Sequence, residues 1–501
     1  MDHGKICISI CPAGLADLLE QVRRAETLAD VIEIRLDHLR PGDLDDAIAS
    51  LPEIGPSYLF TYRPSEQGGR RVLPLAERIK FWIKLRNRIP DGDHLVDHEP
   101  DILGRTGFAA DRVTASVHQF TPLPPEALPR YEMFDRSLAS VYKVAIAAAD
   151  ITDAIPIWKM LGQAREDSRQ LVPIAMGEPG KWTRILGPAH GAAMTYASLD
   201  EDNAAAPGQI TAEDLIDVYR VRDLTPQTAV YGVIAGDTSY SMSPYIQNAA
   251  FRAAKLDAVF LPLQVADLES FIRRMVSVST REIELNFRGF AVTNPHKQAI
   301  LEHLDEIDPT AREIGAVNTI AIRDDRLIGY NTDAAGFLSP LLPHLQSISD
   351  PHVAIVGAGG AARACVYALT QSGARITVYA RDGAKARSIA QEFGSEHRTL
   401  SDEPFEADIL VNATPIGTKG PHQSETIASA RQLERVKLVY DLTYNPQETV
   451  LLREASAAGC KTIGGLEMLV AQAAEQFKIW TGNDADTAAM LTAAEKRLAG
   501  R

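Results

Sequence analysis

The first 200 residues alternate between short apolar runs and longer amphipathic stretches. Eight runs rich in β-branched and aromatic residues recur along this region, at residues 5–10, 31–37, 58–63, 94–99, 113–118, 141–148, 171–176 and 193–199. Amphipathic segments such as ADLLEQVRRAETLA and LAERIKFWIKLRNRI lie between them. Strands that alternate with helices form parallel sheets. Eight such units predict a (β/α)8 barrel, and a doubly wound open sheet is the alternative.

The pattern changes after residue 200 and then starts again. The segment DEDNAAAPGQ, residues 200–209, predicts a loop, and ITAEDLIDVYRVRDL, residues 210–224, predicts a helix. A linker around residues 225–228 leads to a second β/α series, which begins at VYGVIAG, residues 230–236. Because 501 residues exceed what one hydrophobic core usually holds, we expect a domain boundary near residue 225.

The chain is acidic, with 66 acidic and 51 basic residues and a formal net charge of −15. This balance disfavours nucleic acid or an anionic membrane as a partner, since phosphate contacts need a basic face, but it leaves small anionic substrates open. The four cysteines form no CxxC pair and no His/Cys cluster has zinc spacing, so we expect no metal site. Low cysteine content and the lack of a signal, transit or transmembrane segment predict a cytoplasmic protein.

Polar residues interrupt the predicted barrel strands near their carboxyl ends, where barrel enzymes place their chemistry. They are Glu33, Arg35 and Asp37 in the second strand, Arg63 in the third, His118 in the fifth and Lys143 in the sixth. A strand lysine usually faces solvent, whereas an inward lysine is costly unless it is paired or functional. The histidine, arginine and glutamate at comparable positions favour the second interpretation, a shared site.

Lys143, with His118 on the neighbouring strand, suggests Schiff-base chemistry. The amine would attack a ketone, and a general base would then remove a proton from the carbon beside the iminium. Such a lysine must be partly unprotonated, which a desolvated or cation-lined pocket achieves. Arg63 and Arg184 are candidates both to lower the lysine pKa and to bind a carboxylate. We predict Lys143 as the nucleophile and His118 as the acid/base.

A glycine-rich turn in the second half predicts a dinucleotide site. In VAIVGAGGAARACVYAL, residues 353–369, a strand leads through this turn into a helix. Gly357 permits the tight turn and Gly359 lets the backbone approach a pyrophosphate, whose charge the helix N-terminus stabilises. The predicted cofactor-binding residues of the turn are Gly357, Ala358, Gly359, Gly360 and Ala361.

The following strand, ITVYA, ends at Arg381 rather than at an acidic residue that would hold the ribose of NAD. Arg381 suits a 2′-phosphate, and Lys385 lies one helical turn later. NADP(H) is therefore the predicted cofactor. Asp382 is adjacent and keeps NAD as an alternative.

Polar clusters before the glycine-rich turn predict a substrate site. They are SMSP (241–244), TNPHK (293–297), GAVNTI (315–320) and GYNTDAAGF (329–337). Lys297 and Asp333 form a plausible acid/base pair, because a ketone that accepts hydride also needs a proton. Short hydrogen-bonding side chains suited to a small polyhydroxylated acid are those of Ser241, Ser243, Thr293 and Asn318.

Over residues 230–501 these motifs resemble the shikimate dehydrogenase family, since VNATPIG, YDLTYNP and GLEMLVAQAAEQF follow the glycine turn in the family's order. The resemblance implies that Tyr444 and Gln472 also touch substrate. It further implies a position near the cofactor for Asn412, Thr414 and Gly465. Two positions depart from the family pattern: Ala291 replaces a frequent polar residue, and ARD replaces NRT after the cofactor-discriminating strand.

Residues 5–222 resemble the barrel class of 3-dehydroquinate dehydratase, through EIRLDHL, FTYRPSEQGG, VTASVHQF, VYKVAI, WTRILGPAHG and AAPGQI in order. The resemblance assigns substrate or pocket roles to Ser9, Glu33, Arg35, Arg63, Arg184 and Gln209. Gln67 stands where the family often has glutamate, and Ala205 stands where it often has serine.

Together the resemblances imply a (β/α)8 barrel over residues 1–224, a substrate-binding α/β domain over 228–335 and a Rossmann-type NADP domain over 336–501 with C-terminal helices that return to the substrate domain. The implied activities are dehydration of 3-dehydroquinate through a lysine Schiff base and NADPH-dependent reduction of the product, 3-dehydroshikimate, to shikimate. Partners would be these small molecules, without nucleic acid or membrane, and the oligomeric state stays open. The alternatives are preference for quinate or NAD in the second half, or one domain that senses ligand without turnover.

Overall fold

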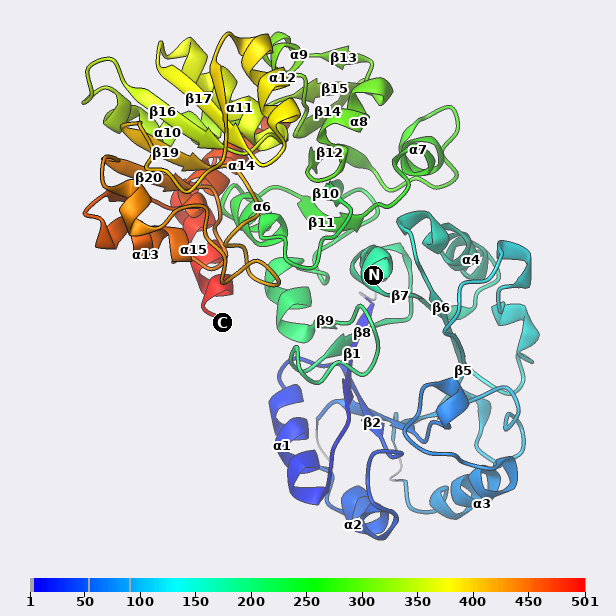
Figure 1. Ribbon diagram of the computed structural model, residues 1–501. Helices are drawn as coiled ribbons and strands as arrows, with labels where there is room; N and C mark the ends of the chain where they lie inside the picture. Colours follow the sequence, from blue (N-terminus) through cyan, green and yellow to red (C-terminus); the bar gives the residue numbers. More distant parts are fainter. Residues whose placement is uncertain (1–3, 53–54, 90–91, 501) are drawn as a thin grey trace. The chain divides into compact units, whose positions relative to one another are not determined.

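The structure is a computed structural model that describes residues 4–52, 55–89 and 92–500 (Figure 1). The chain divides into two compact units. Unit 1 comprises Met1–Ala229, Asp237–Ser239 and Leu261–Asn286, and unit 2 comprises Val230–Gly236, Tyr240–Phe260 and Phe287–Arg501.

Unit 1 is built around one curled parallel sheet. Its strands are β1 (Lys5–Ile10), β2 (Val31–Arg35), β3 (Ser57–Thr61), β4 (Leu95–His98), β5 (Val113–Gln119), β6 (Val141–Ala147), β7 (Gln170–Met176), β8 (Met194–Ser198) and β9 (Ile210–Thr211). Their order is β7-β6-β5-β4-β3-β2-β1-β8-β9. The Ala193 amide donates to the Leu171 carbonyl over 2.8 Å, which brings the start of β8 beside β7. The eight predicted strands are confirmed, and the sheet curls into a barrel rather than staying open (Figure 1).

Helices pack on the outside of this barrel (Figure 1). They are α1 (Leu15–Ala25), α2 (Leu44–Ala49), α3 (Leu75–Leu85), α4 (Ile155–Glu166) and α5 (Lys181–Leu186). The described residues between β5 and β6 form two short 3₁₀ turns, Pro125–Ala127 and Tyr131–Met133, in place of an α-helix. Proline explains the difference, because FTPLPPEALPR cannot supply the amide donors that a helix needs. Such short connections let a barrel form within about 220 residues.

The prediction of a helix over the whole of residues 210–224 is wrong. Ile210 is buried and pairs with Ala197 of β8, so the segment begins as strand β9. A π-helical segment then covers Asp214–Val218 only. The backbone of Arg220 takes a left-handed conformation, with φ of 51°, which ends the helical segment.

Unit 2 contains two sheets, and strand β11 of the first continues into unit 1. The first sheet has the order β11-β10-β12-β14-β15-β13. Its strands are β10 (Ala229–Ala235), β11 (Ala258–Gln264), β12 (Phe287–Val292), β13 (Glu306–Ile307), β14 (Thr319–Arg323) and β15 (Arg326–Tyr330). Helices in this part of the sequence are α6 (Ser243–Ala253), α7 (Leu268–Phe271), α8 (His296–Ala299) and α9 (Pro309–Ile314).

The second sheet has the order β18-β17-β16-β19-β20-β21, with every neighbouring pair parallel. Its strands are β16 (His352–Val356), β17 (Arg375–Ala380), β18 (Glu396–Thr399), β19 (Ile409–Asn412), β20 (Leu438–Asp441) and β21 (Lys461–Ile463). The helices are α10 (Asp333–Leu345), α11 (Gly360–Gln371), α12 (Gly383–Phe393), α13 (Val450–Ala457), α14 (Gly465–Thr481) and α15 (Thr487–Leu498).

Both faces of this second sheet are covered. Val353 and Ile355 of β16 pack into one apolar cluster, whereas the intervening Ala354 and Val356 pack into another. A strand that is buried on both faces reads as a continuous apolar run, as the VAIV sequence does. The strand order, with its reversal beside the first strand, is that of a doubly wound dinucleotide-binding sheet.

Candidate active sites

A cavity opens over the carboxyl ends of the barrel strands, and all eight residues predicted for the first site line it. They are Ser9, Glu33, Arg35, Arg63, His118, Lys143, Arg184 and Gln209. Gln67 and Ala205, where the chain departs from the family pattern, line the same cavity. Except for Arg184, which lies in helix α5 after β7, the predicted residues come from strands or from the loops after them, so the closed sheet brings them together.

Lys143 lies in the middle of β6, opposite Ser116 of β5 and Val172 of β7. Its side chain is buried, and its amine lies 3.6 Å from the centroid of the Tyr196 ring. Among the described residues the amine has no hydrogen bond or ion pair. Burial lowers the pKa of this amine, and the nearby Arg63 lowers it further, against the opposing effect of Glu33 and Asp97. The environment therefore favours the neutral, nucleophilic form.

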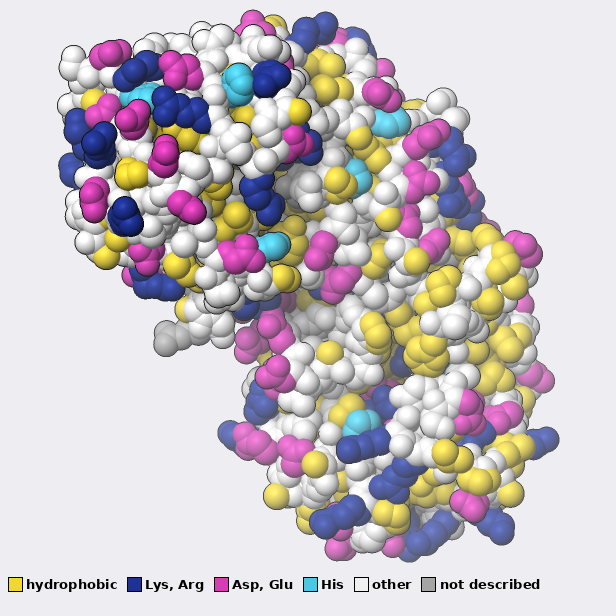
Figure 2. Space-filling model, viewed as in Figure 1, with side chains coloured by type: hydrophobic (Ala, Val, Ile, Leu, Met, Phe, Trp, Pro, Cys, Tyr) yellow, Lys and Arg dark blue, Asp and Glu magenta, His cyan; other side chains and the backbone are white. Residues whose placement is uncertain are grey.

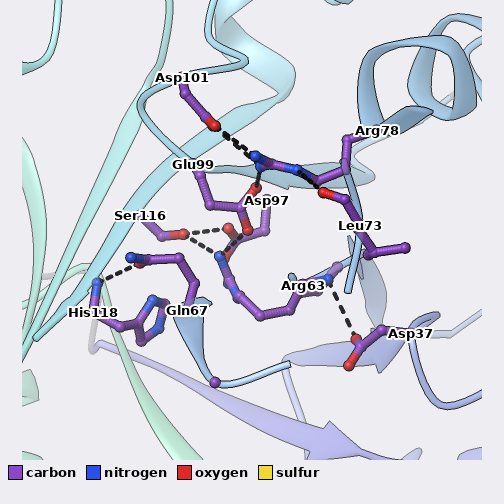
Figure 3. Close-up of polar contacts among 12 residues, drawn as sticks. Asp37, Arg63, Gln67, Leu73, Arg78, Asp97, Glu99, Asp101, Ser116 and His118 are labelled. Carbon is purple, nitrogen blue, oxygen red and sulfur yellow. Dashed lines mark hydrogen bonds and ion pairs between the residues drawn. The ribbon is translucent and has the colours of Figure 1, made fainter. Parts of the chain in front are cut away.

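His118 lies near the end of β5, in the strand next to Lys143. Its backbone amide donates to the Gln67 side-chain oxygen over 2.9 Å (Figure 3). The ring stacks on Phe120, with centroids 6.2 Å apart, and its Nδ1 has no hydrogen-bond partner among the described residues. Burial holds the pKa of His118 well below its usual range, assisted by Arg63 and Lys143. A neutral imidazole with a free ring nitrogen can accept a proton.

Two of the three cavity arginines are already neutralised. Asp37 binds the Arg35 guanidinium through two contacts of 2.9 Å. The buried Arg63 guanidinium is held between Asp97, at 2.8 Å, and Glu99, at 2.7 Å (Figure 3). The charge of Arg63, which the sequence suggested together with Arg184 as a carboxylate clamp, is thus already balanced by two carboxylates of the protein.

Arg184 is the third, and it has no acidic partner among the described residues. Its guanidinium is buried and reaches only two backbone carbonyls, of Tyr196 and Pro207, each at 3.5 Å. Burial lowers the pKa of Arg184 to about 10. A buried cation without a counter-ion is unfavourable unless an anion joins it, so Arg184 is the natural partner for a substrate carboxylate.

Two glutamines border the cavity with their side-chain oxygens fixed. The Gln209 oxygen accepts from the Ala205 amide over 2.6 Å and from the Ala206 amide over 3.3 Å. The Gln67 oxygen accepts from His118, as described above. An amide whose oxygen is bound in this way leaves its NH₂ group as a free donor. Both glutamines can therefore donate hydrogen bonds to hydroxyl groups in the cavity.

In unit 2 the predicted acid/base pair is in direct contact. Lys297 of α8 lies 2.5 Å from the Asp333 carboxylate at the start of α10. The Asn318 side chain donates to the other Asp333 oxygen over 2.7 Å and lies 3.4 Å from the Gln472 oxygen. Asp333 and Asn318 are buried, whereas the Lys297 side chain is 19% exposed. Asp333, which Asn318 holds in place, thus fixes the partly exposed lysine amine.

The other predicted substrate residues of this unit lie before or at the start of α6 (Ser241 and Ser243) and in the loops after β12 (Thr293) and β20 (Tyr444). Ser241 precedes α6, and its hydroxyl accepts from the Ser243 amide over 3.3 Å. Thr293 follows β12, and its amide donates to the Ile234 carbonyl. Tyr444 follows β20, where burial and the nearby Tyr240 raise the pKa of its phenol to about 12. No hydrogen bond joins these four side chains to Lys297 or Asp333 in the described part of the chain.

The glycine-rich turn has the geometry that a dinucleotide needs. Gly357 has φ of 137°, and a Cβ there would lie 2.6 Å from the Ala413 carbonyl oxygen, so only glycine fits. A Cβ on Gly359 would meet open space, which leaves room for a ligand against the start of α11. A Cβ on Gly360 would lie 3.5 Å from the Lys297 side chain. The turn, residues 357–361, therefore adjoins the acid/base pair.

The cations after β17 are available, whereas the neighbouring carboxylate is not. Asp382 caps α12, since its side chain accepts from the amides of Ala384 and Lys385. The Arg381 and Lys385 side chains are exposed and have no ion-pair partner among the described residues. Asp382, the residue that left NAD as an alternative cofactor, thus caps a helix.

Three predicted cofactor residues instead shape the loops beside the turn. The Asn412 amide donates to Asp441 over 2.9 Å, and the Thr414 hydroxyl donates to the Asn412 oxygen over 2.7 Å. A Cβ on Gly465 would lie 2.3 Å from the Leu442 carbonyl oxygen. The polar side-chain groups of Asn412 and Thr414 are thus bonded within the protein, and the close backbone approach at Gly465 requires glycine.

Family models and relatives match both halves of the chain. The family model of type I 3-dehydroquinase matches residues 6–226, and that of the shikimate dehydrogenase substrate binding domain matches residues 233–320. Models of shikimate/quinate 5-dehydrogenase and of the shikimate 5′-dehydrogenase C-terminal domain match residues 342–448 and 465–495. The chain is 34% identical to the chloroplastic bifunctional 3-dehydroquinate dehydratase/shikimate dehydrogenase of Arabidopsis thaliana, over 94% of this chain and 82% of the relative.

The chain belongs to this bifunctional family. Its second half is also 37% identical to the shikimate dehydrogenase (NADP(+)) of Methanothermobacter thermautotrophicus, over 52% of this chain and 94% of the relative. A crystal structure of shikimate dehydrogenase in complex with NADP+ has a TM-score of 0.51 and 38% identity, over 55% of this chain and 97% of that one.

Sequence reasoning missed several residues of the dehydratase half. Asp97 and Glu99 hold Arg63, the Ser116 hydroxyl donates to Asp97, and Arg78 binds Glu99 at 2.9 Å (Figure 3). Asp97 and Glu99 alternate along HLVDHE as Glu33 and Arg35 do along VIEIRLD, so the period-two pattern of a strand could have found them. Tyr196 carried no signal, because an aromatic residue in a strand usually indicates core.

Two further observations concern partners. Within the described residues, no group of three or more His, Cys, Asp and Glu side chains is arranged to hold a metal ion. No helix in the described ranges is both long and apolar enough to cross a membrane. On the face drawn in Figure 2, acidic and basic side chains are interspersed.

Proposed function

We propose that the chain catalyses two consecutive steps of the shikimate pathway: dehydration of 3-dehydroquinate to 3-dehydroshikimate, and reduction of that product to shikimate with NADPH. One observation supports this most strongly: a buried amine beside a neutral histidine and a bound Lys–Asp pair beside a glycine turn occur in the same chain. We assign residues 1–224 to the dehydratase, 228–335 to substrate binding and 336–501 to the cofactor domain.

The proposed dehydration begins when the Lys143 amine attacks the ketone carbon. Loss of water gives an iminium, which acidifies the adjacent carbon. The His118 imidazole removes a proton from that carbon, and the resulting enamine expels the β-hydroxyl, which leaves as water with the proton that His118 returns. Water then hydrolyses the conjugated iminium and releases Lys143. Arg184 binds the substrate carboxylate throughout.

In the proposed reduction, bound NADPH supplies the hydride. Lys297 donates a proton to the oxygen of the reduced carbonyl, and Asp333 orients the lysine and balances its charge. Ser241, Ser243, Thr293, Asn318, Tyr444 and Gln472 form the proposed substrate-binding set. The loop of residues 357–361 would hold the pyrophosphate, with Arg381 and Lys385 at the 2′-phosphate.

Trapping with borohydride tests the first half of this proposal. Borohydride reduces an iminium to a stable amine, so incubation with 3-dehydroquinate should add the mass of the reduced ligand to the Lys143 peptide. Samples without 3-dehydroquinate should show no adduct. Mass spectrometry that finds no adduct on Lys143 in an active sample would refute the Schiff-base step.

Replacing Arg381 with alanine tests the cofactor assignment. If its guanidinium binds the 2′-phosphate, Arg381→Ala should raise KM for NADPH about 10-fold or more and change KM for NADH little. Steady-state kinetics of 3-dehydroshikimate reduction with NADPH or NADH give the two KM values, and oxidation of shikimate or quinate with NADP+ or NAD+ compares the substrates. An equal rise in KM for NADPH and for NADH would contradict the assignment of Arg381 to the 2′-phosphate.

Two other outcomes would favour the alternatives. A higher kcat/KM for quinate than for shikimate would favour quinate as the substrate, and absence of turnover would favour a sensor.

Small molecules are thus the proposed partners, and no nucleic acid or membrane contact is part of the proposal. The expected cytoplasmic location stays a prediction, since the Arabidopsis relative is chloroplastic.

A further inference from the structure

The aromatic ring of Tyr196 is the group in closest described contact with the reactive amine. Tyr196 lies in β8, is buried and lines the cavity. The Lys143 nitrogen lies over its face, 3.6 Å from the ring centroid. No sequence motif pointed to this residue. A cation at this distance from an aromatic face is attracted by the negative electrostatic potential of the ring.

The anions around the amine are engaged elsewhere. Glu33 accepts from the Ser9 hydroxyl over 2.5 Å and from the Thr61 hydroxyl over 2.8 Å. Asp97 binds Arg63 and accepts from Ser116. The remaining ionisable neighbours are Arg63, which opposes a positive charge on Lys143, the neutral imidazole of His118 and the Cys7 thiol. No carboxylate therefore forms an ion pair with the lysine nitrogen in the described part of the chain.

This arrangement meets two opposing requirements of Schiff-base chemistry. The free lysine must lose its proton to attack, but the iminium that forms is positively charged. A carboxylate in contact would serve the iminium and at the same time hold the free lysine protonated. A neutral ring stabilises a cation more weakly than a carboxylate does. In a desolvated site, the stabilisation by the ring changes an equilibrium constant by about 10- to 30-fold. The ring can therefore stabilise the iminium without preventing the attack of the free lysine on the ketone.

We propose that Tyr196 is a catalytic residue of the dehydratase, whose ring face stabilises the iminium by a cation–π interaction. This inference rests on the proposed Schiff-base step. It concerns the ring and not the phenol hydroxyl, because the nitrogen lies over the ring centre.

The test uses the full chain with phenylalanine at position 196 as the reference, followed by phenylalanines that carry one, two and three fluorines. Fluorine withdraws charge from the ring face while nearly preserving its shape. The rate of dehydration should fall stepwise, to about one-tenth of the Tyr196→Phe value with three fluorines. The fraction of Lys143 trapped by borohydride at equilibrium should fall in parallel. Tyr196→Leu, which has no ring, should lie lowest.

Controls distinguish the possible causes of a lower dehydration rate. The same fluorinated series at Phe60, a buried ring of β3 outside the cavity lining, should leave dehydration unchanged. If rate and trapping do not change with fluorine content at position 196, the cation–π role is overturned, even if Tyr196→Leu fails to fold. If the unaltered chain traps no adduct on Lys143 although it is active, the Schiff-base proposal itself has failed, which is a separate result.

Discussion

Replacing Lys143 with alanine is expected to lower kcat for dehydration of 3-dehydroquinate by at least about 10³-fold, because no other group in the cavity can form the iminium. Reduction of 3-dehydroshikimate should stay within about twofold of the unaltered rate, since the Lys297–Asp333 pair lies in the other compact unit. Steady-state assays of each half-reaction with the same preparation measure both effects.

The matched control is Lys80→Ala, which removes an exposed lysine of helix α3 and should leave both activities unchanged. A Lys143→Ala enzyme that retains a tenth of its dehydration rate would show that the amine is not the nucleophile. If Lys143→Ala abolishes both activities, either the chain has misfolded or the two reactions share one site. Circular dichroism of the variant distinguishes these two explanations.

The barrel could be predicted because its strands are buried on both sides and therefore read as compact apolar runs. The same pattern indicated Lys143 as a candidate, because its charge interrupts the apolar run VYKVAI. The pattern could not show which charges are neutralised by neighbours. Arg63 and Arg184 look equivalent in the sequence, but Asp97 and Glu99 bind only Arg63. These contacts join the segment after β3 to β4 and to the loop after β4. Pairings of this kind depend on the closed sheet.

In the second half, local motifs predicted the glycine turn and the Lys297–Asp333 pair, because each has a short sequence signature. The roles of Asp382 and Asn412 were not predictable in the same way. Asp382 caps the helix that follows it, and Asn412 is bonded to Asp441 from the next strand. Whether a polar residue faces a ligand or satisfies the backbone depends on contacts that no motif records.

Replacing Asp333 with asparagine is expected to produce the opposite pattern to Lys143→Ala. The substitution keeps the size of the side chain and an oxygen that can accept from Asn318, but it removes the charge that Lys297 contacts at 2.5 Å. Loss of general acid–base assistance typically costs about 10²- to 10⁴-fold, so kcat for reduction should fall by that amount. Dehydration should be unchanged within about twofold.

The measurement is again both half-reactions on one preparation, now with a pH profile for reduction. Asp402→Asn, which neutralises an exposed carboxylate between β18 and β19, is the matched control and should leave both rates unchanged. KM for NADPH should change little, because Asp333 contacts the proton donor and not the turn of residues 357–361. A large rise in KM for NADPH with an unaltered kcat would instead assign Asp333 to cofactor binding. A rate that stays at the level of the unaltered enzyme across the pH range would remove Asp333 from the proton-transfer step altogether.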